Sequence, residues 1–149
     1  MGWQGARGED ICRRVAAGGM GETIRQATGI PVSPYYSAAK LAWILENVPA
    51  AAQLAGKGRL CCSTMDAWLV FRLCGGEAKT DFSNASRTQL FNVDSLAWDE
   101  DVCGAFGLKT EWLPRVVDSN SLFGHGDFGR ALPAPVPVHG VLGDSHGAL

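Results

Sequence analysis

The sequence has no excess of positive charge: 13 Lys and Arg stand against 15 Asp and Glu, for a net charge of −2. A surface that follows a phosphate backbone needs clustered Lys and Arg, so we expect no nucleic-acid partner. No uninterrupted apolar run is long enough to span a bilayer, and the N-terminal residues lack the apolar core of a signal peptide. We therefore expect a cytoplasmic protein with no membrane association.

Cysteine is present, but without the spacing of a zinc site or a disulfide framework. The count is odd, two cysteines are adjacent, and none form a Cys-x-x-Cys pair; they are Cys12, Cys61, Cys62, Cys74 and Cys103. We expect small buried thiols in a reducing cytosol. The three histidines have no ligand-pair spacing, so we expect no metal site. The glycines at 124, 126 and 129 lack the Lys and Ser/Thr that complete a Walker A loop.

The residues that are present indicate a globular chain. Apolar residues make up 46% and charged residues 19%, and 149 residues can form one domain with a core. The clearest helix is predicted from Ser37 to Val48, where Leu41, Ile44 and Leu45 share an apolar stripe with Val48. Other short helices, each ended by glycine, are predicted to begin at Glu9, Gly21, Pro49, Met65 and Asp99.

Short apolar runs predict strands between these helices. Leu60–Cys62 and the run from Val136 to Leu142 are interpreted as buried strands, and Gln89–Val93 as a further strand. In the helix that begins at Met65, the apolar face contains Met65, Trp68, Leu69 and Leu73. Alternating short strands and helices indicate an α/β fold, with α+β also open.

The final apolar run ends at Gly143 and presents a carboxylate at Asp144. A carboxylate beside small residues leaves space for a ligand, and it can orient a hydroxyl and accept its proton. The alternative is a helix N-cap, which is a common role for Asp at a strand-to-helix turn. The local sequence leaves both roles open.

Two aromatic positions and one polar stretch are further candidates for substrate contact. Tyr35 follows Pro34 in an extended segment, where its ring can pack on a polyol or lie in the core. Trp3 lies in a Gly-rich segment and either lines a ligand site or packs on later helices. The stretch Asn84–Arg87 either binds an anion or joins a loop through side-chain hydrogen bonds, and we favour the loop.

Taken together, these stretches resemble the glycerol-kinase-like branch of the FGGY carbohydrate kinase family. The similar segments keep their order along nearly the whole chain: Trp3-Gln4 with Arg7, Thr28–Ser37 with Lys40 and Trp43, Thr64–Leu69, Thr80–Thr88 with Leu90–Asn92, and Gly143-Asp144. The resemblance implies part of an actin-like, ribonuclease-H-like ATPase domain, the later part of the N-terminal, sugar-binding domain. It implies a single partial domain over residues 1–149, without the C-terminal ATP-binding domain.

The resemblance also implies an activity and its residues. Kinases of this family transfer the γ-phosphoryl group of ATP to a polyol or sugar hydroxyl with Mg²⁺, and the acid of the Gly-Asp motif acts as base. That acid corresponds to Asp144, and the aromatic polyol contacts correspond to Trp3 and Tyr35. We expect a fragment of an ATP-dependent kinase, with glycerol as the leading substrate, that is inactive in isolation.

The sequence departs from the glycerol kinase pattern beside the acid. Two glutamines usually follow it, and the first touches the substrate; here Ser145 and His146 occupy these positions. Because serine is shorter, a different polyol or sugar is an alternative substrate, and a non-catalytic truncated module is a second alternative. Without the family's opening strands, the sheet would have an open edge, so self-association into a homo-oligomer is also expected.

Overall fold

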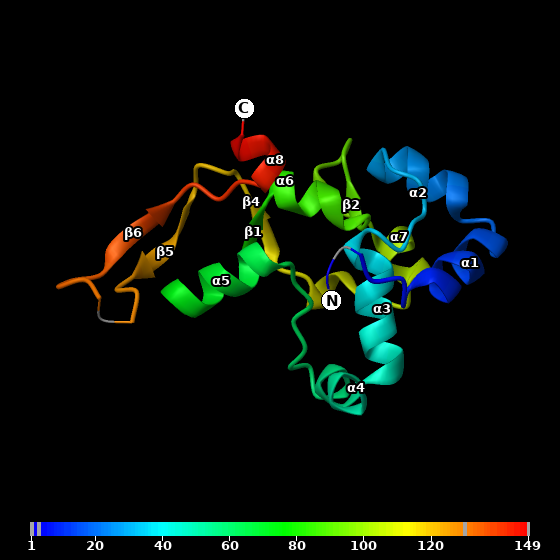
Figure 1. Ribbon diagram of the computed structural model, residues 1–149, viewed down its shortest axis with the longest axis horizontal. Helices are drawn as coiled ribbons and strands as arrows, with labels where there is room; N and C mark the ends of the chain where they lie inside the picture. The colour runs from blue at the N-terminus through cyan, green and yellow to red at the C-terminus, as the bar shows by residue number, and fades with distance from the viewer. Residues whose placement is uncertain (1, 3, 130, 149) are drawn as a thin grey trace. The chain divides into compact units, whose positions relative to one another are not determined.

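The computed structural model describes residue 2, residues 4–129 and residues 131–148. The chain divides into two compact units. Unit 1 comprises the described residues of Met1–Cys62 and Ser86–Leu113, and unit 2 comprises those of Ser63–Ala85 and Pro114–Leu149. Figure 1 shows the elements along the chain.

Unit 1 consists mainly of short helices that enclose an apolar core. Its elements are α1 (Glu9–Ala17), α2 (Gly21–Thr28), α3 (Ser37–Asn47), α4 (Pro49–Gly56), η1 (Ser86–Thr88), β2 (Phe91–Asn92), β3 (Ala97–Trp98), α7 (Glu100–Ala105) and η2 (Thr110–Trp112). Strands β2 and β3 pair antiparallel. Ile24, Leu90 and Val102 are fully buried in this core, which therefore joins residues that lie far apart in the sequence.

Helix α3 occupies almost the residues that the apolar spacing predicts, but a different face is buried. Its buried residues are Ala38, Ala39, Lys40 and Ala42, whereas Leu41, Ile44 and Leu45 are only half-buried. The inner face is made of small residues because the chain before α1 lies very close: a Cβ at Gly8 would lie 2.7 Å from the Ala39 Cβ.

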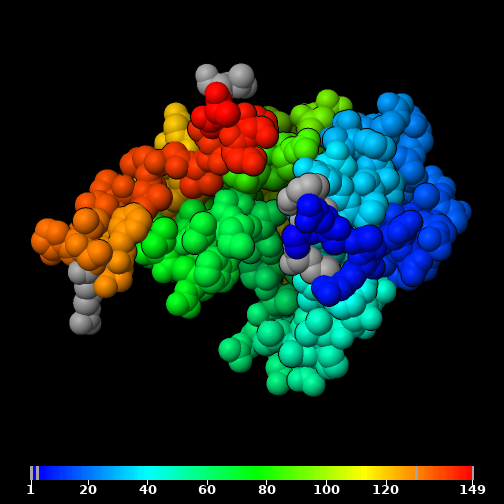
Figure 2. Space-filling model, in the orientation of Figure 1, coloured from blue at the N-terminus to red at the C-terminus, as the bar shows by residue number. Residues whose placement is uncertain are grey.

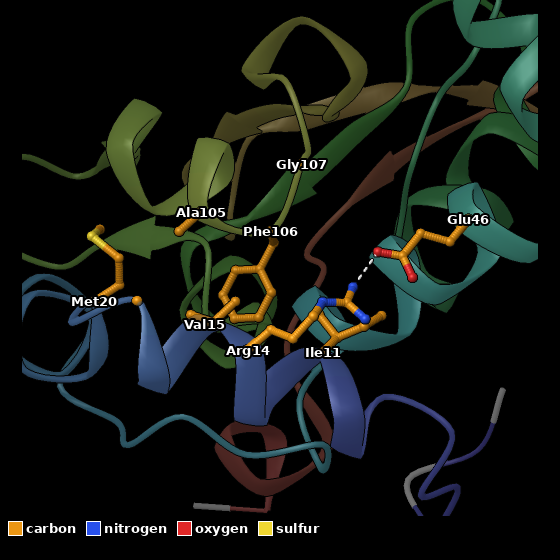
Figure 3. A pocket seen from close by; sticks show the side chains of 9 residues that line it. Ile11, Arg14, Val15, Met20, Glu46, Ala105, Phe106 and Gly107 are labelled. Carbon is orange, nitrogen blue, oxygen red and sulfur yellow. Dashed lines mark hydrogen bonds and ion pairs between the residues drawn. The ribbon is translucent and has the colours of Figure 1, made fainter.

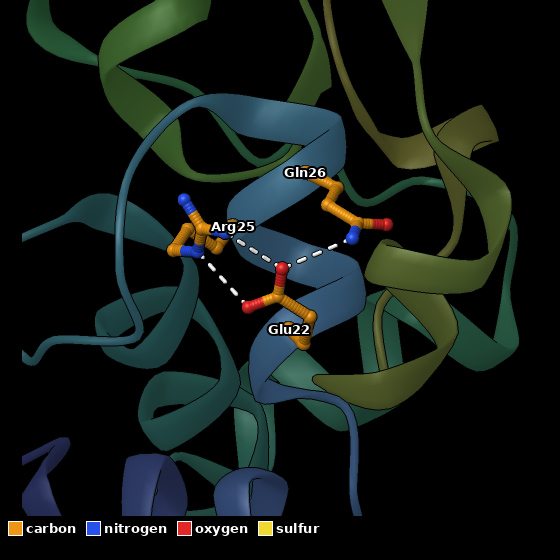
Figure 4. A network of polar contacts seen from close by, with 3 residues as sticks. All are labelled: Glu22, Arg25 and Gln26. Carbon is orange, nitrogen blue, oxygen red and sulfur yellow. Dashed lines mark hydrogen bonds and ion pairs between the residues drawn. The ribbon is translucent and has the colours of Figure 1, made fainter.

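Polar side chains support two helices of unit 1. Asp99 is the N-cap of α7 and its side chain accepts from the Val102 N–H at 2.9 Å, which confirms the predicted helix start. On α2, Glu22 accepts from Arg25 and Gln26 one turn later (Figure 4). The hydrogen bond from Arg25 is the main cause that lowers the pKa of Glu22. This network is solvent-exposed, so we interpret it as support for the helix rather than a binding site.

Unit 2 combines a parallel strand pair, an antiparallel hairpin and helices. Its elements are α5 (Met65–Cys74), β1 (Lys79–Asp81), α6 (Phe82–Ala85), β4 (Arg115–Val117), β5 (Leu122–Gly126), β6 (Val136–His139) and α8 (Asp144–Gly147). Thr80 of β1 is the partner of Val116 in the parallel pair with β4. Strands β5 and β6 pair antiparallel as a hairpin. The prediction of a mixed α and β fold is confirmed.

Two predictions of buried strands are wrong. Leu60–Cys62 forms no strand; the Cys62 N–H donates to the Trp112 carbonyl within unit 1 instead. The final strand β6 ends at His139 and is mostly exposed, because its one strand partner among the described residues is β5. An apolar run is buried only where other elements cover it, and local sequence does not show that cover.

The apolar face predicted for α5 is also wrong. Its buried residues are Ala67 and Val70, whereas Met65 and Trp68 are 69% and 52% exposed. The atoms of this region are green in Figure 2 and lie on the visible surface. Strand β5 approaches this helix closely at its last two residues, Leu73 and Cys74.

Glycines on β5 make that close approach feasible. A Cβ at Gly126 would lie 2.7 Å from the Leu73 carbonyl oxygen, and one at Gly124 would lie 2.5 Å from the Cys74 Cβ. We therefore expect Gly126→Ala to lower the free energy of unfolding by about 1–3 kcal/mol through overpacking. Urea denaturation followed by circular dichroism measures this.

Gly104→Ala is the matched control for Gly126→Ala. Gly104 lies in helix α7 with nothing within 4 Å of its added Cβ, so the same change should be neutral or stabilising. Equal stabilities of the two variants would contradict the packing of α5 on β5.

No helix among the described residues is long and apolar enough to cross a bilayer.

Candidate functional site

Asp144 is the first residue of helix α8, and Gly143 is its N-cap. Gly143 has extended backbone angles, so the strand-to-helix turn places the acid inside the first helical turn. The alternative in which Asp144 is the N-cap is therefore wrong. The Asp144 side chain is exposed, and its Oδ1 accepts from the Ser145 N–H at 2.8 Å and the Ser145 hydroxyl at 3.5 Å.

The segment before Asp144 is tied to unit 2 by two hydrogen bonds. The Gly143 N–H donates to the Ser83 Oγ at 2.7 Å. Two residues earlier, the Val141 N–H donates to the Ser119 carbonyl at 2.9 Å. The Gly143 carbonyl in turn accepts from the His146 N–H at 2.9 Å within α8. The backbone on which the acid stands is thus specified on both sides of Gly143.

Asp81 is a second carboxylate of unit 2 and is completely buried. It accepts the Ser83 hydroxyl at 2.5 Å, the Ser119 hydroxyl at 2.6 Å and the Asn84 side-chain amide at 2.7 Å. It also accepts the backbone N–H groups of Ser83 and Asn84 at 3.0 and 3.1 Å. Burial alone would raise the pKa of Asp81, but these hydrogen bonds outweigh burial and lower that pKa.

The sequence did not single out Asp81. A usable signal was present, since an Asp followed two and three residues later by Ser and Asn is typical of a side-chain-supported turn. Asn84 donates its side-chain amide to the Asp81 carboxylate from helix α6, and the rest of its stretch lies in α6 and η1, so the predicted loop is wrong. The contribution of Ser119 could not be found in this way, because it lies 38 residues away along the chain.

Tyr35 lies in unit 1, at the turn before α3. Its side chain is 47% exposed, so ordinary core packing does not describe it. The ring contacts Tyr36 edge-on, with centroids 5.1 Å apart. Buried Lys40 fixes this turn, because its Nζ donates to the carbonyls of Pro34, Tyr35 and Tyr36. Burial lowers the pKa of Lys40.

The predicted site residues that the structure describes are divided between the two units. Asp144 and Ser145 are hydrogen-bonded neighbours in unit 2, whereas Tyr35 belongs to unit 1. Trp3 lies outside the described residues. The roles of these four residues in substrate binding and catalysis therefore stay predictions.

A separate hollow of about 250 Å³ lies within unit 1 (Figure 3). Its walls are largely apolar, with Met20 and Phe106 among them, and the Arg14–Glu46 ion pair stands at its side. None of the predicted site residues that the structure describes lines it, so we do not include it in the candidate site.

The cysteines form no disulfide, and three of the five are buried as expected. Cys61 is exposed, contrary to that expectation. Burial raises the pKa of Cys62 to about 11 and of Cys103 to about 12, so these thiols stay protonated at neutral pH. Among the residues that the structure describes, no three His, Cys, Asp or Glu side chains are grouped to hold a metal ion.

Comparison with known proteins identifies the family. The model of the "FGGY family of carbohydrate kinases, N-terminal domain" matches residues 1–149. This chain belongs to the FGGY family of carbohydrate kinases. The family resemblance drawn from the sequence motifs is therefore confirmed.

Individual FGGY kinases show the same relationship. Glycerol kinase 1 of Thermotoga maritima is 44% identical and glycerol kinase of Xanthobacter autotrophicus 45% identical, each over 99% of this chain. A crystal structure of Plasmodium falciparum glycerol kinase with ADP has a TM-score of 0.89 and 31% sequence identity to this chain. The match covers 98% of this chain and 29% of the Plasmodium chain. The predicted actin-like fold is confirmed. The chain spans about 30% of the length of the two sequence relatives.

Proposed function

We propose that this chain supplies the catalytic base and part of the substrate site of an ATP-dependent polyol kinase, with glycerol as the leading substrate. The observation that supports this most is the placement of Asp144. Its carboxylate is exposed at the start of α8, on a backbone tied by Ser83 and Ser119, in a chain 44% identical to a glycerol kinase.

The proposed chemistry is a phosphoryl transfer. Asp144 orients the attacking hydroxyl of the polyol and accepts its proton. The hydroxyl oxygen forms a bond to the γ-phosphorus of ATP, and the bond from that phosphorus to the bridging oxygen breaks to release ADP. Tyr35 and Trp3 are proposed to contact the carbon face of the polyol.

ATP supplies the phosphoryl group, and Mg²⁺ would neutralise its charge. No residue of this chain is assigned to either of them, because the described residues contain no cluster suited to a metal ion. The parts of the reaction that we assign to residues of this chain are holding the polyol and moving its proton.

Ser145 supports a second candidate, a kinase for another polyol or sugar. Its side chain is exposed beside Asp144 and leaves more space than the glutamine usual in glycerol kinases. A larger substrate could use that space. A non-catalytic module is the remaining alternative, and ADP release in the presence of a polyol distinguishes both kinases from it. Self-association through an open sheet edge stays a prediction.

We expect the 149-residue chain alone to show no ATP-dependent phosphorylation, because it spans about 30% of the length of its kinase relatives. A coupled ADP-release assay with glycerol and a panel of polyols and sugars measures this. The positive control is a longer polypeptide that contains the same residues together with the family's ATP-binding domain, and its preferred substrate decides between glycerol and a larger polyol. Turnover by the 149-residue chain, or none by the longer one with any substrate, would contradict the proposal.

A further inference from the structure

The buried acid Asp81 and the exposed acid Asp144 are connected through a single side chain. The Ser83 hydroxyl donates a hydrogen bond to the Asp81 Oδ2 at 2.5 Å, and the same hydroxyl oxygen accepts one from the Gly143 N–H at 2.7 Å. Gly143 directly precedes Asp144 and is the N-cap of its helix. One hydroxyl group therefore separates the buried carboxylate from the backbone of the proposed base.

The orientation of the Ser83 hydroxyl is specified by Asp81. A hydroxyl can donate or accept hydrogen bonds in several directions, whereas an ionised carboxylate can only accept them. Because the Ser83 hydroxyl donates its hydrogen bond to Asp81, a lone pair of the Ser83 oxygen is directed to the Gly143 N–H. A charge-assisted hydrogen bond of this kind is stronger than a neutral one and keeps the donor in place.

Ser119 gives a second connection of the same type. Its hydroxyl donates to the Asp81 Oδ2 at 2.6 Å, and its carbonyl accepts the Val141 N–H at 2.9 Å. The two serines thus donate to the same Asp81 oxygen. They also accept the N–H groups of Val141 and Gly143, in the segment that leads into Asp144. An added Cβ at Gly143 would lie 3.1 Å from the His146 Nδ1, a tight approach, and at an ordinary contact distance of 3.5 Å from the Ser83 Oγ.

We propose that Asp81, acting through Ser83 and Ser119, is the positioning residue for Asp144. It touches no substrate; it fixes the turn at Gly143, and this sets where the Asp144 carboxylate meets the polyol hydroxyl. A displacement of about 1 Å at a reacting group can cost roughly 10²-fold in rate, so a rigid mount for the base has a direct kinetic value. This inference rests on the proposed function of Asp144 as base.

The test is a double-mutant cycle between Ser83 and Asp144 in the longer kinase polypeptide that contains the ATP-binding domain. Ser83→Ala should lower kcat for the polyol about 10-fold or more, with a smaller change in the KM for ATP. Ser83→Thr retains the hydroxyl and should restore most of the rate. In the Asp144→Asn background, Ser83→Ala should have little further effect, because the group that it positions is already gone.

A second readout does not depend on activity. In the 149-residue chain, Ser83→Ala should speed hydrogen exchange of the Gly143 amide, measured by NMR, while amides of α1 in unit 1 keep their rates. Unchanged exchange at Gly143, or an equal loss of rate from Ser83→Ala with and without Asp144, would overturn the positioning role. If Asp144→Asn itself kept a normal rate, the proposed base would be wrong, and this outcome is distinct from failure of the positioning inference.

Discussion

Replacing Asp144 with asparagine is expected to lower kcat by about 10²–10⁴-fold in the longer kinase polypeptide, because the change removes the proton acceptor and keeps the shape. The KM for the polyol should change much less, since an amide oxygen can still accept a hydrogen bond from the hydroxyl. Steady-state ADP release with the preferred polyol measures both constants.

Asp94→Asn is the matched control for this experiment. Asp94 is an exposed acid in unit 1, so the same chemical change should leave kcat within the error of the assay. The Asp144→Asn chain should also unfold at the same urea concentration as the parent, because Asp144 is exposed and its hydrogen bonds are local. A near-normal rate for Asp144→Asn would remove this residue from the base role.

Replacing Asp81 with alanine is expected to destabilise the chain by about 3 kcal/mol or more. The substitution removes a buried acceptor and leaves the Ser83, Asn84 and Ser119 donors around it without their partner. Asp94→Ala, at an exposed position, should change stability by about 0.5 kcal/mol or less. Urea denaturation of the 149-residue variants measures the difference, and equal stabilities would show that the Asp81 network contributes little to folding.

The same carboxylate should make stability depend on pH. The pKa of Asp81 is lower in the folded chain than in the unfolded chain, so its stabilising effect is present above the unfolded pKa of about 4. The effect is lost as the pH falls through the lower, folded pKa. We therefore expect the stability gap between the parent and Asp81→Asn to be constant near neutral pH and to narrow below about pH 4. A gap that widens in acid would contradict the lowered pKa of Asp81.

The positions of the helices could be predicted from the sequence, because the residues that begin and end a helix lie within a few positions of it. The glycine after each helix, the cap at Asp99 and the helical spacing of Ser37–Val48 act over a few residues, and the structure has helices at these places. The family could also be inferred, because five short motifs kept their order along the chain. Which face of a helix is buried could not be inferred, since the predicted stripe of α3 is only half-buried and α5 buries Ala67 and Val70 instead of Met65 and Trp68.

Asp144 also shows which features local sequence predicts and which depend on the tertiary structure. From the sequence alone, Asp144 was identified as a candidate base with a helix cap as the alternative, and the residues beside it raised the substrate question. Only the tertiary structure placed Gly143 at the cap and connected it to Asp81 through Ser83, across 60 residues of sequence. A hydrogen bond between segments so far apart depends on how the strands and helices of unit 2 pack, and no local pattern of residues specifies that packing.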